Sequence, residues 1–219
     1  MRVLVTRARP EAATLVARLE ERGLEVAVCP LIRIEPLDGP SIDTSGYDWV
    51  VVTSRNGARE LAGRWTGELR RVAAIGPGTA EELRGYGVEP VLVPRVSTQE
   101  GLLAELPRPA GRVLFAGAED ARRLLVDELD ADFVPLYRTV PELPAEPPEA
   151  DLAVLASGSA ARVFAQLGLA IPAVVMGPQT AQAARAAGVE VLAEAPQQTL
   201  ASLVETVVSV AAELEAVER

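Results

Sequence analysis

Short apolar runs alternate with amphipathic stretches of about a dozen residues along most of the chain. The runs Trp49–Val52 and Val72–Ile75 are almost continuously apolar, as expected for strands buried on both faces of a sheet. Nearer the start, Leu15 and Leu19 follow helical spacing, and Gly23 ends that helical pattern. Strands that alternate with helices in this way are typical of βαβ units and parallel sheets.

The same order of elements occurs twice along the chain. Segment A, residues 2–36, is echoed by segment A′, residues 112–141, and each predicts a strand, a helix and a second strand. A second pair, B and B′, opens with the matching stretches 49–63 and 152–166. The repeat therefore predicts two domains of similar construction.

Segments B and B′ continue in parallel. They share the motif Gly-Pro-x-Thr at 76–79 and 177–180, predicted strands at 87–94 and 188–196, and predicted helices at 97–106 and 198–207. Two proline-marked stretches, 30–40 and 135–148, follow A and A′, and proline favours extended linkers and sheet edges. The predicted fold is α/β, with two similar doubly wound parallel-sheet domains joined by a two-stranded linker ribbon.

Candidate binding residues follow the predicted strands, because ligands of open α/β sheets bind beyond the carboxyl ends of the strands. They are Thr6, Arg7, Thr53, Ser54, Arg55, Asn56, Gly76, Gly78, Thr79, Gly117, Ser157, Gly158, Ser159, Gly177, Gln179 and Thr180. Where such a corner opens a helix, unpaired backbone N–H groups and the positive end of the helix dipole attract carboxylates or phosphates.

Several of these residues also fit helix-capping patterns. Thr79 with Glu82 predicts an N-cap in a capping box, and Thr180 occupies the matching N-cap position without the glutamate. Ser97 with Glu100 predicts a further capping box. The alternative interpretation is that these residues only cap helices and bind no ligand.

The composition excludes several kinds of chemistry. The chain has no histidine, and all of its basic residues are arginine, so histidine acid–base catalysis, histidine metal ligands and lysine Schiff bases are excluded. A single cysteine, Cys29, excludes an internal disulfide. No G-x-G-x-x-G motif indicates a dinucleotide site, and we expect no metal and no cofactor.

Charge and hydropathy limit the partners. A formal charge of −10 argues against nucleic-acid binding, which needs a basic surface. The apolar runs are shorter than the roughly 20 residues that span a bilayer, and the first residues lack the pattern of a signal peptide. We expect a cytoplasmic protein that binds neither membrane nor nucleic acid.

One position breaks the symmetry between A and A′. When "PLIRIEP" is aligned with "PLYRTVP", Tyr137 stands opposite Ile32. One interpretation is a tyrosine half-buried at a domain junction. The other is a phenol that faces the ligand as a proton or hydrogen-bond donor.

The chain resembles the uroporphyrinogen-III synthase family along essentially its whole length. The motifs that carry the resemblance are "VLVTR", "PLIRIEP", "VVVTSRNGA", "AAIGPGTAEEL", "PLYRTV", "ASGSAARVF" and "MGPQTAQAARAAG". Each motif is loose by itself, but their order and spacing together are more specific.

The resemblance implies interleaved domains. Residues 1–35 plus 143–219 would form domain 1, residues 38–137 domain 2, and stretches of about 30–38 and 135–143 the linker strands. The internal repeat by itself leaves open the pairing of A with B and of A′ with B′. A cleft between the domains would hold the substrate.

The resemblance also implies the chemistry. A member of this family dehydrates hydroxymethylbilane, a linear tetrapyrrole, and cyclises it with inversion of ring D to uroporphyrinogen III, as a cofactor-independent lyase. Family positions in the cleft correspond to Thr79, Thr180, Ser54 and Ser157, and Tyr137 corresponds to the best candidate for assisting hydroxyl loss. This chain has Ala156 where the first repeat has Thr53, so the two corners differ in polarity.

The expected partner is therefore a small-molecule tetrapyrrole, and the expected state is a monomer. The alternative function is a non-catalytic bilobal binding protein, a sensor or carrier for an anionic small molecule.

Overall fold

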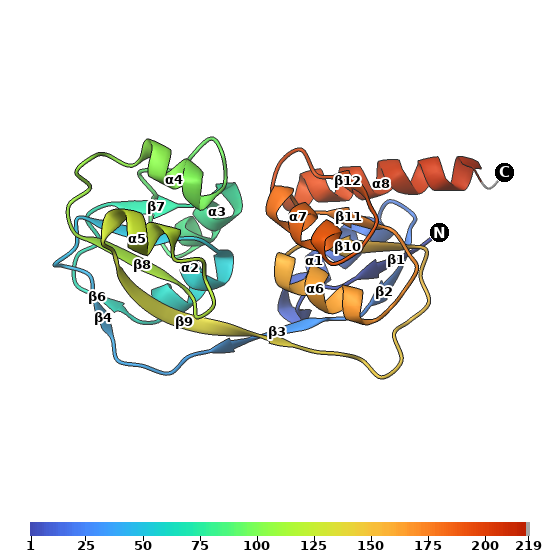
Figure 1. Cartoon of the computed structure of the whole chain (residues 1–219), viewed down its shortest axis with the longest axis horizontal. Coiled ribbons are helices and arrows are strands. Elements are labelled where there is room, and N and C mark those ends of the chain that lie inside the picture. Colours follow the sequence, from blue (N-terminus) through green and yellow to red (C-terminus); the bar gives the residue numbers. More distant parts are fainter. Residues whose placement is uncertain (218–219) are drawn as a thin grey trace. The chain divides into compact units, whose positions relative to one another are not determined.

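The computed structural model describes the backbone of residues 1–217 and the side chains of residues 1–8 and 12–216. It divides into two compact units. Unit 1 consists of Met1–Arg33 and Val140–Arg219, and unit 2 consists of Ile34–Thr139. Each unit contains its own sheet, and Figure 1 labels the helices and strands where there is room.

Unit 1 contains a five-stranded sheet in the order β12-β11-β10-β1-β2. Its strands are β1 (Arg2–Val5), β2 (Glu25–Val28), β10 (Leu152–Leu155), β11 (Ala173–Val175) and β12 (Val191–Glu194). All four neighbouring pairs are parallel, and β1 lies between β2 on one side and β10 on the other. Strands from both parts of unit 1 therefore form one sheet.

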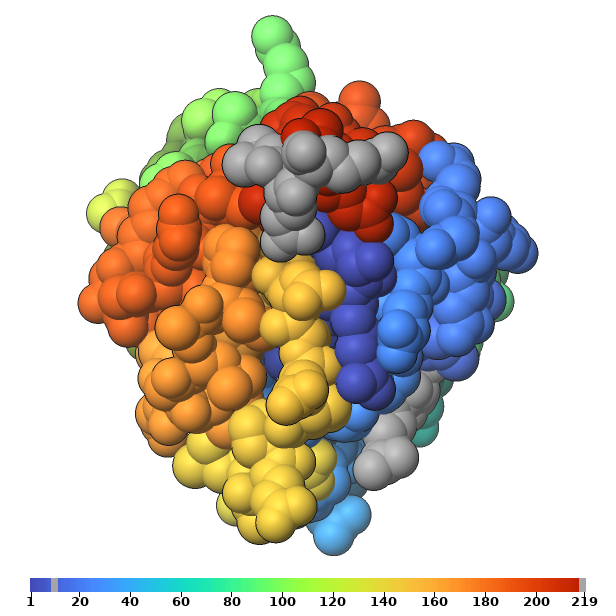
Figure 2. All heavy atoms as spheres, turned by 90° about the vertical axis from the view of Figure 1, so that its right-hand side faces the viewer, coloured from blue at the N-terminus to red at the C-terminus, as the bar shows by residue number. Residues whose placement is uncertain are grey.

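Helices cover both faces of the unit 1 sheet. They are α1 (Arg9–Glu20), α6 (Gly158–Gln166), α7 (Pro178–Ala186) and α8 (Leu200–Val217). Residues of α1 and α8, such as Leu15 and Leu203, pack in one apolar cluster with Val3, and residues of α6 and α7 pack in another with Leu4. Val3 and Leu4 are neighbours on one strand, so the two clusters lie on opposite faces. Figure 2 shows the blue N-terminal segment beside the yellow segment that follows unit 2, with the red C-terminal helix above them.

Unit 2 also contains a five-stranded sheet, in the order β3-β9-β8-β5-β7, of which the pairs β9-β8, β8-β5 and β5-β7 are parallel. Its strands are β3 (Ile32–Pro36), β5 (Trp49–Val52), β7 (Val72–Ala74), β8 (Val113–Ala118) and β9 (Asp132–Pro141), and its helices are α2 (Arg55–Ala62), α3 (Pro77–Gly85), α4 (Gln99–Glu105) and α5 (Leu124–Leu129). Helices α2 and α3 pack on one face and α4 and α5 on the other. The predicted α/β class with parallel, doubly wound sheets is confirmed.

Two strands carry the chain from one unit to the other. The boundary falls within β3, between Arg33 and Ile34, and within β9, between Thr139 and Val140. The Leu37 N–H donates to the Leu136 carbonyl at 2.8 Å, and the Glu142 N–H donates to the Leu31 carbonyl at 2.8 Å. Since residue numbers rise on one strand as they fall on the other, the two strands run antiparallel.

One predicted strand is wrong. Residues 87–94 form only an isolated bridge, between Ala73 and Leu92, whereas the matching stretch 188–196 contains the four-residue strand β12. Pro90 and Pro94 lack the N–H groups that a continuous ladder needs, and the corresponding part of unit 1 has no proline before Pro196.

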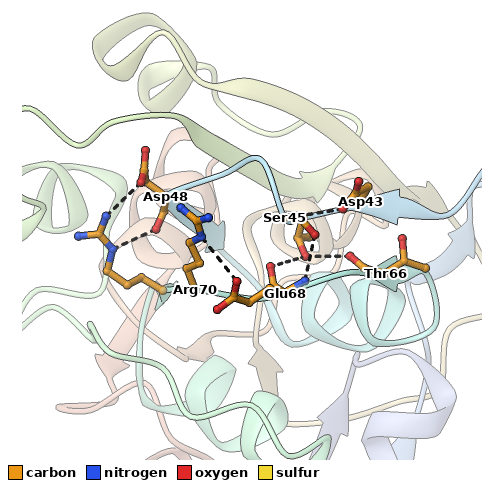
Figure 3. A network of polar contacts seen from close by, with 8 residues as sticks. Asp43, Ser45, Asp48, Thr66, Glu68 and Arg70 are labelled. Atoms are coloured by element: carbon orange, nitrogen blue, oxygen red, sulfur yellow. Dashed lines mark hydrogen bonds and ion pairs between the residues drawn. The ribbon is translucent and has the colours of Figure 1, made fainter.

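Unit 2 also contains a small sheet that the sequence did not predict, formed by β4 (Ile42–Asp43) and β6 (Trp65–Thr66). Figure 3 shows the polar network beside it, in which the Ser45 N–H donates to Asp43 at 3.0 Å and the Glu68 N–H donates to the Ser45 hydroxyl at 3.2 Å. The buried Thr44 hydroxyl lies 3.0 Å from the carbonyl of Thr66. The network lies before β5 and β7, at the end of the sheet away from the candidate residues.

Candidate functional site

In the corner after β5 in unit 2, the candidate residues Ser54 and Arg55 form hydrogen bonds with other candidate residues. Ser54 caps α2 in an extended conformation, and its hydroxyl accepts the Gly57 N–H at 2.8 Å. The hydroxyl oxygens of Ser54 and Tyr137 lie 2.9 Å apart. The structure thus joins two predicted site residues that are 83 positions apart in the sequence.

Tyr137 lies on β9, with its ring in the apolar core of unit 2. It is 6% exposed, and it packs in the cluster that contains Leu136 and Ala58. It is therefore more buried than the half-buried tyrosine of the alternative interpretation. Its hydroxyl lies beside the start of α2, where the backbone presents the positive end of a helix dipole.

Gly117 and Thr53 lie side by side at the ends of adjacent strands. A Cβ on Gly117 would lie 3.1 Å from the Phe115 ring and 3.5 Å from the Thr53 hydroxyl. The absence of a side chain at Gly117 thus leaves room at the end of β8 for the Phe115 ring and the Thr53 hydroxyl. The side-chain oxygen of Asn56, in the first turn of α2, is buried and accepts no hydrogen bond from the residues that the structure describes.

The corner after β7 has a different construction from the one we predicted. Gly76 is the N-cap of α3, Pro77 is the first helical residue, and Thr79 is buried in the first turn. Thr79 is therefore not an N-cap, because proline fits the first helical position and starts the helix earlier. Glu82 does not complete a capping box but pairs with Arg59 of α2 at 3.3 Å.

The matching corner of unit 1 also has a glycine N-cap followed by proline at the first helical position. Gly177 is the N-cap of α7, Pro178 follows it, and Thr180 is buried in the first turn. The N-cap prediction for Thr180 is wrong for the same reason. Neither Gly76 nor Gly177 has a side chain to accept the first N–H groups of its helix. These two corners therefore offer backbone donors to an anion, more than the serine-capped corners do.

Two residues outside the predicted binding set lie beside these corners: Ser97, which the sequence indicated only as a helix cap, and Gln198, which it did not indicate. A Cβ on Gly76 would lie 2.6 Å from the Ser97 hydroxyl, and one on Gly177 would lie 2.8 Å from Gln198. Ser97 and Gln198 occupy matching positions of the repeat. The matched stretches 97–106 and 198–207 already place the two residues opposite each other, but no local pattern shows that they lie beside the glycine caps. Ser97 does not cap α4, because the Thr98 hydroxyl accepts the Gly101 N–H at 3.1 Å.

Arg55 links the two corners of unit 2. Its Nε donates to the Gly78 carbonyl at 3.0 Å, and its Nη2 donates to Glu81 at 2.6 Å. Glu81 is largely exposed, so the ion pair itself adds little to stability. Arg55 therefore positions the α3 corner of its own unit.

In unit 1, the Thr6 side chain serves the sheet. Thr6 is fully buried, and its hydroxyl donates to the Val154 carbonyl at 2.8 Å. Arg7, which follows it, is half-buried. Thr6 therefore joins β1 to β10 with its hydroxyl and is a poor candidate for a direct ligand.

The corner after β10 resembles the one after β5. Ser157 caps α6 and accepts the Ala160 N–H at 3.2 Å. A Cβ on Gly158 would lie 3.1 Å from the Ala183 Cβ of α7. The Ser159 hydroxyl accepts Arg162 Nη2 at 3.3 Å, and Gln179 is exposed in the first turn of α7.

Among the side chains of residues 1–8 and 12–216, no cluster of three or more acidic or cysteine groups could hold a metal ion. Within residues 1–217, no helix combines the length and the apolar character needed to cross a membrane.

Comparison with known proteins gives one consistent answer. The family model described as uroporphyrinogen-III synthase HemD matches residues 13–205. An Archaeoglobus fulgidus relative whose name contains uroporphyrinogen-III synthase is 35% identical over 130 residues, 57% of this chain and 54% of its own length. A Chlorobaculum parvum protein named uroporphyrinogen-III synthase is 32% identical over 114 residues, 48% of this chain and 46% of its own. The chain thus spans about half the length of the curated relatives it matches.

The fold has a solved counterpart. A crystal structure of mutant uroporphyrinogen III synthase from the extremely thermophilic bacterium Thermus thermophilus is similar with a TM-score of 0.63 and 20% sequence identity. The alignment covers 94% of this chain and 96% of that one. At this identity the likeness supports the fold alone.

Proposed function

Because the chain belongs to the uroporphyrinogen-III synthase family, we propose that it dehydrates hydroxymethylbilane and cyclises it, with inversion of ring D, to uroporphyrinogen III. The observation that carries the proposal is the pair of Gly-Pro-x-Thr corners, one in each unit, whose glycine N-caps leave helix N–H groups without a side-chain acceptor. Such corners suit a substrate that carries several carboxylates.

The first chemical step is the loss of the terminal hydroxyl group as water. The cation-like azafulvene that remains is attacked by the substituted carbon of ring D, and a spiro intermediate rearranges before the ring closes. Holding ring D so that this bond forms first is a task of orientation. It uses no metal and no cofactor, and we propose that none is required.

We propose that Tyr137 assists the departing hydroxyl. A phenol ordinarily has a pKa near 10, so at neutral pH it acts as a donor and not as a base. Its place beside Ser54 and the start of α2 supports this role, because the dipole there favours developing negative charge.

We propose that backbone N–H groups at helix starts allow this acidic chain to bind an acidic substrate. The formal charge is −10, but screening limits distant charges to about 8 Å at physiological salt. We propose that the carboxylates of the substrate bind the first turns of α3 and α7, at Gly76, Gly78, Gly177 and Gln179. Arg55, whose Nε donates to the Gly78 carbonyl, supplies positive charge at the α3 corner, and we propose that Arg7, which follows β1, helps to attract the substrate.

We propose that residues 1–35 plus 143–219 and residues 38–137 are the two domains, which the division into compact units supports. We also propose that the protein acts as a monomer in the cytoplasm. Light scattering of the purified chain, with and without substrate, measures the oligomeric state.

The decisive test supplies hydroxymethylbilane to the purified, chelator-treated protein and separates the type I and type III products. We expect type III in excess, with only type I from a heat-inactivated sample. Equal amounts of type I with active and inactivated protein would overturn the proposal. Binding of the bilane without conversion would support the alternative of a carrier or sensor.

A further inference from the structure

The hydroxyl of Ser54 contacts two groups of unit 2, the Gly57 N–H and the Tyr137 hydroxyl. It accepts the Gly57 N–H at 2.8 Å, and its oxygen lies 2.9 Å from the Tyr137 hydroxyl oxygen, in a bond for which either oxygen is able to donate. We propose that Ser54 is a positioning residue that donates to the phenol oxygen of Tyr137 while Tyr137 gives up its proton. This inference rests on the proposed function, in which Tyr137 is the proton donor.

The direction of the bond follows from proton counting. A serine hydroxyl has one donor and two lone pairs, and the Gly57 N–H occupies one lone pair. Once Tyr137 has lost its proton, the phenolate oxygen can only accept, so Ser54 must donate. A hydrogen bond to an ionised oxygen is roughly twice as strong as a neutral one. The contact thus stabilises the transition state more than the resting state.

The start of α2 strengthens the effect. Ser54 is the N-cap of an eight-residue helix, and its oxygen receives the Gly57 N–H. Hydrogen bonds arranged in a chain polarise one another, so the Gly57 contact makes the Ser54 hydroxyl a stronger donor. The burial of Tyr137, at 6% exposure, weakens competition from water.

The proton balance of the step is closed. The carbon–oxygen bond of the hydroxymethyl group breaks with its electron pair on oxygen, and the Tyr137 proton converts that oxygen to water. Tyr137 remains as a phenolate held by the Ser54 hydroxyl. Ring closure later releases a proton from the substrate, and this proton returns to Tyr137.

Unit 1 provides a matched control for the contact. Ser157 caps α6 as Ser54 caps α2, and it accepts the Ala160 N–H at 3.2 Å. The residue that corresponds to Tyr137 is Ile32, which has no hydroxyl. Ser157→Ala therefore removes the same kind of cap without touching a phenol.

The experiment measures the titration of Tyr137 directly. Tyr47→Phe and Tyr86→Phe leave Tyr137 as the only tyrosine of three, and its titration is followed by absorbance with circular dichroism as a check on folding. We expect Ser54→Ala to raise the pKa of Tyr137 by about one unit, and Ser157→Ala to leave it unchanged. Ser54→Gly keeps an acceptable N-cap residue but removes the hydroxyl, so it serves if the alanine variant folds poorly.

Turnover in the otherwise native chain provides the second readout. We expect Ser54→Ala and Ser54→Gly to lower kcat about tenfold with little change in KM, and Ser54→Thr to restore both kcat and the Tyr137 titration. An unshifted Tyr137 titration in Ser54→Ala, or a loss of turnover that threonine does not restore, would overturn the inference. Failure of the proposed function is distinguished by the absence of type III product from the native chain.

Discussion

The two units build the same pair of corners with different side chains. In unit 2, Arg55 reaches from the start of α2 to the Gly78 carbonyl of the α3 corner at 3.0 Å. The matching residue of unit 1 is Gly158, where a Cβ would lie 3.1 Å from the Ala183 Cβ of α7 and 3.9 Å from the Gln179 carbonyl. A side chain links the corners in one unit, and close helix packing brings them together in the other. The two units therefore share the backbone of these corners but differ in the side-chain contacts that link them.

A second contrast concerns the residue that faces the serine cap. Tyr137 meets Ser54 in unit 2, whereas Ile32 is part of the apolar cluster beside α6 in unit 1. Only unit 2 therefore pairs a phenol with a capping serine. The proposed division of labour is that both units bind carboxylates and unit 2 alone supplies the proton.

The largest expected effect concerns a glycine that the repeat does not share. A Cβ on Gly101 would lie 2.0 Å from the Val96 carbonyl oxygen, whereas the matching residue of unit 1 is Ser202, whose hydroxyl accepts the Gln197 N–H at 3.1 Å. Gly101→Ser is expected to lower the free energy of unfolding by about 3 kcal/mol, because the backbone must move.

Denaturant unfolding measures this change. Both tryptophans, Trp49 and Trp65, lie in unit 2, so their fluorescence reports that unit. The reverse change, Ser202→Gly in unit 1, is followed by circular dichroism and is expected to cost about 1 kcal/mol through a lost hydrogen bond and a poorer helix residue. Equal costs for the two changes would show that the corners are built alike.

The next effect tests the contrast between Tyr137 and Ile32. Tyr137→Phe keeps the ring and removes the hydroxyl, and we expect turnover to fall roughly tenfold to a hundredfold, or about 1.4–2.7 kcal/mol of transition-state stabilisation. The residual product should remain the type III isomer. Tyr47→Phe, which removes a hydroxyl bonded to Asp132 at 2.9 Å, should leave turnover unchanged. Native turnover in Tyr137→Phe would make the tyrosine a packing residue only.

A smaller effect tests the arginine link. Arg55→Ala removes the bond to Gly78 and the exposed pair with Glu81, and it should lower the stability of unit 2 by about 1 kcal/mol. Arg162→Ala in unit 1, which removes an exposed contact with Ser159, should change stability, followed by circular dichroism, by less than about 0.5 kcal/mol. Fluorescence that reports no loss for Arg55→Ala would indicate that α2 and α3 hold together by packing, as α6 and α7 do.

The smallest effect depends on pH. The Arg122 guanidinium lowers the pKa of Glu100 from 4.5 to about 2, and the matching residue of unit 1 is Ala201. Because the folded pKa is depressed, the contribution is present above pH 4.5 and is lost as the pH falls toward 2. Glu100 is exposed, so the contribution should be only a few tenths of a kcal/mol. Glu100→Gln should flatten this part of the stability profile, and an unchanged profile would contradict the expectation.

Local patterns predicted the backbone well. The buried strands and the helices that follow them could be predicted because apolar runs are local. The sequence analysis gave Ser54 and Ser157 only as binding candidates, although a serine just before a helix is a local signal for the caps that they form. The N-caps of α3 and α7 were misassigned, although the proline at the first helical position is a local signal for Gly76 and Gly177.

Long-range partners could not be read from the sequence. Glu82 pairs with Arg59 and Glu100 pairs with Arg122, each across more than 20 residues, so neither glutamate joins a capping box. The contact between Tyr137 and Ser54 depends on the register of β9 beside β8, which no local pattern fixes. Pro90 and Pro94, which have no N–H to donate to a ladder, interrupt the strand expected at 87–94.

The split construction of unit 1 bears on how the chain is made. Strand β1 lies between β2 and β10, and residues 152–155 of β10 leave the ribosome about 150 residues after β1. At 5–20 residues per second, the nascent chain carries β1 with one edge unpaired for roughly 7–30 s. All of unit 2 is synthesised within that interval. A ribosome that stalls between residues 34 and 151 would therefore hold an apolar strand edge open to pairing with other chains.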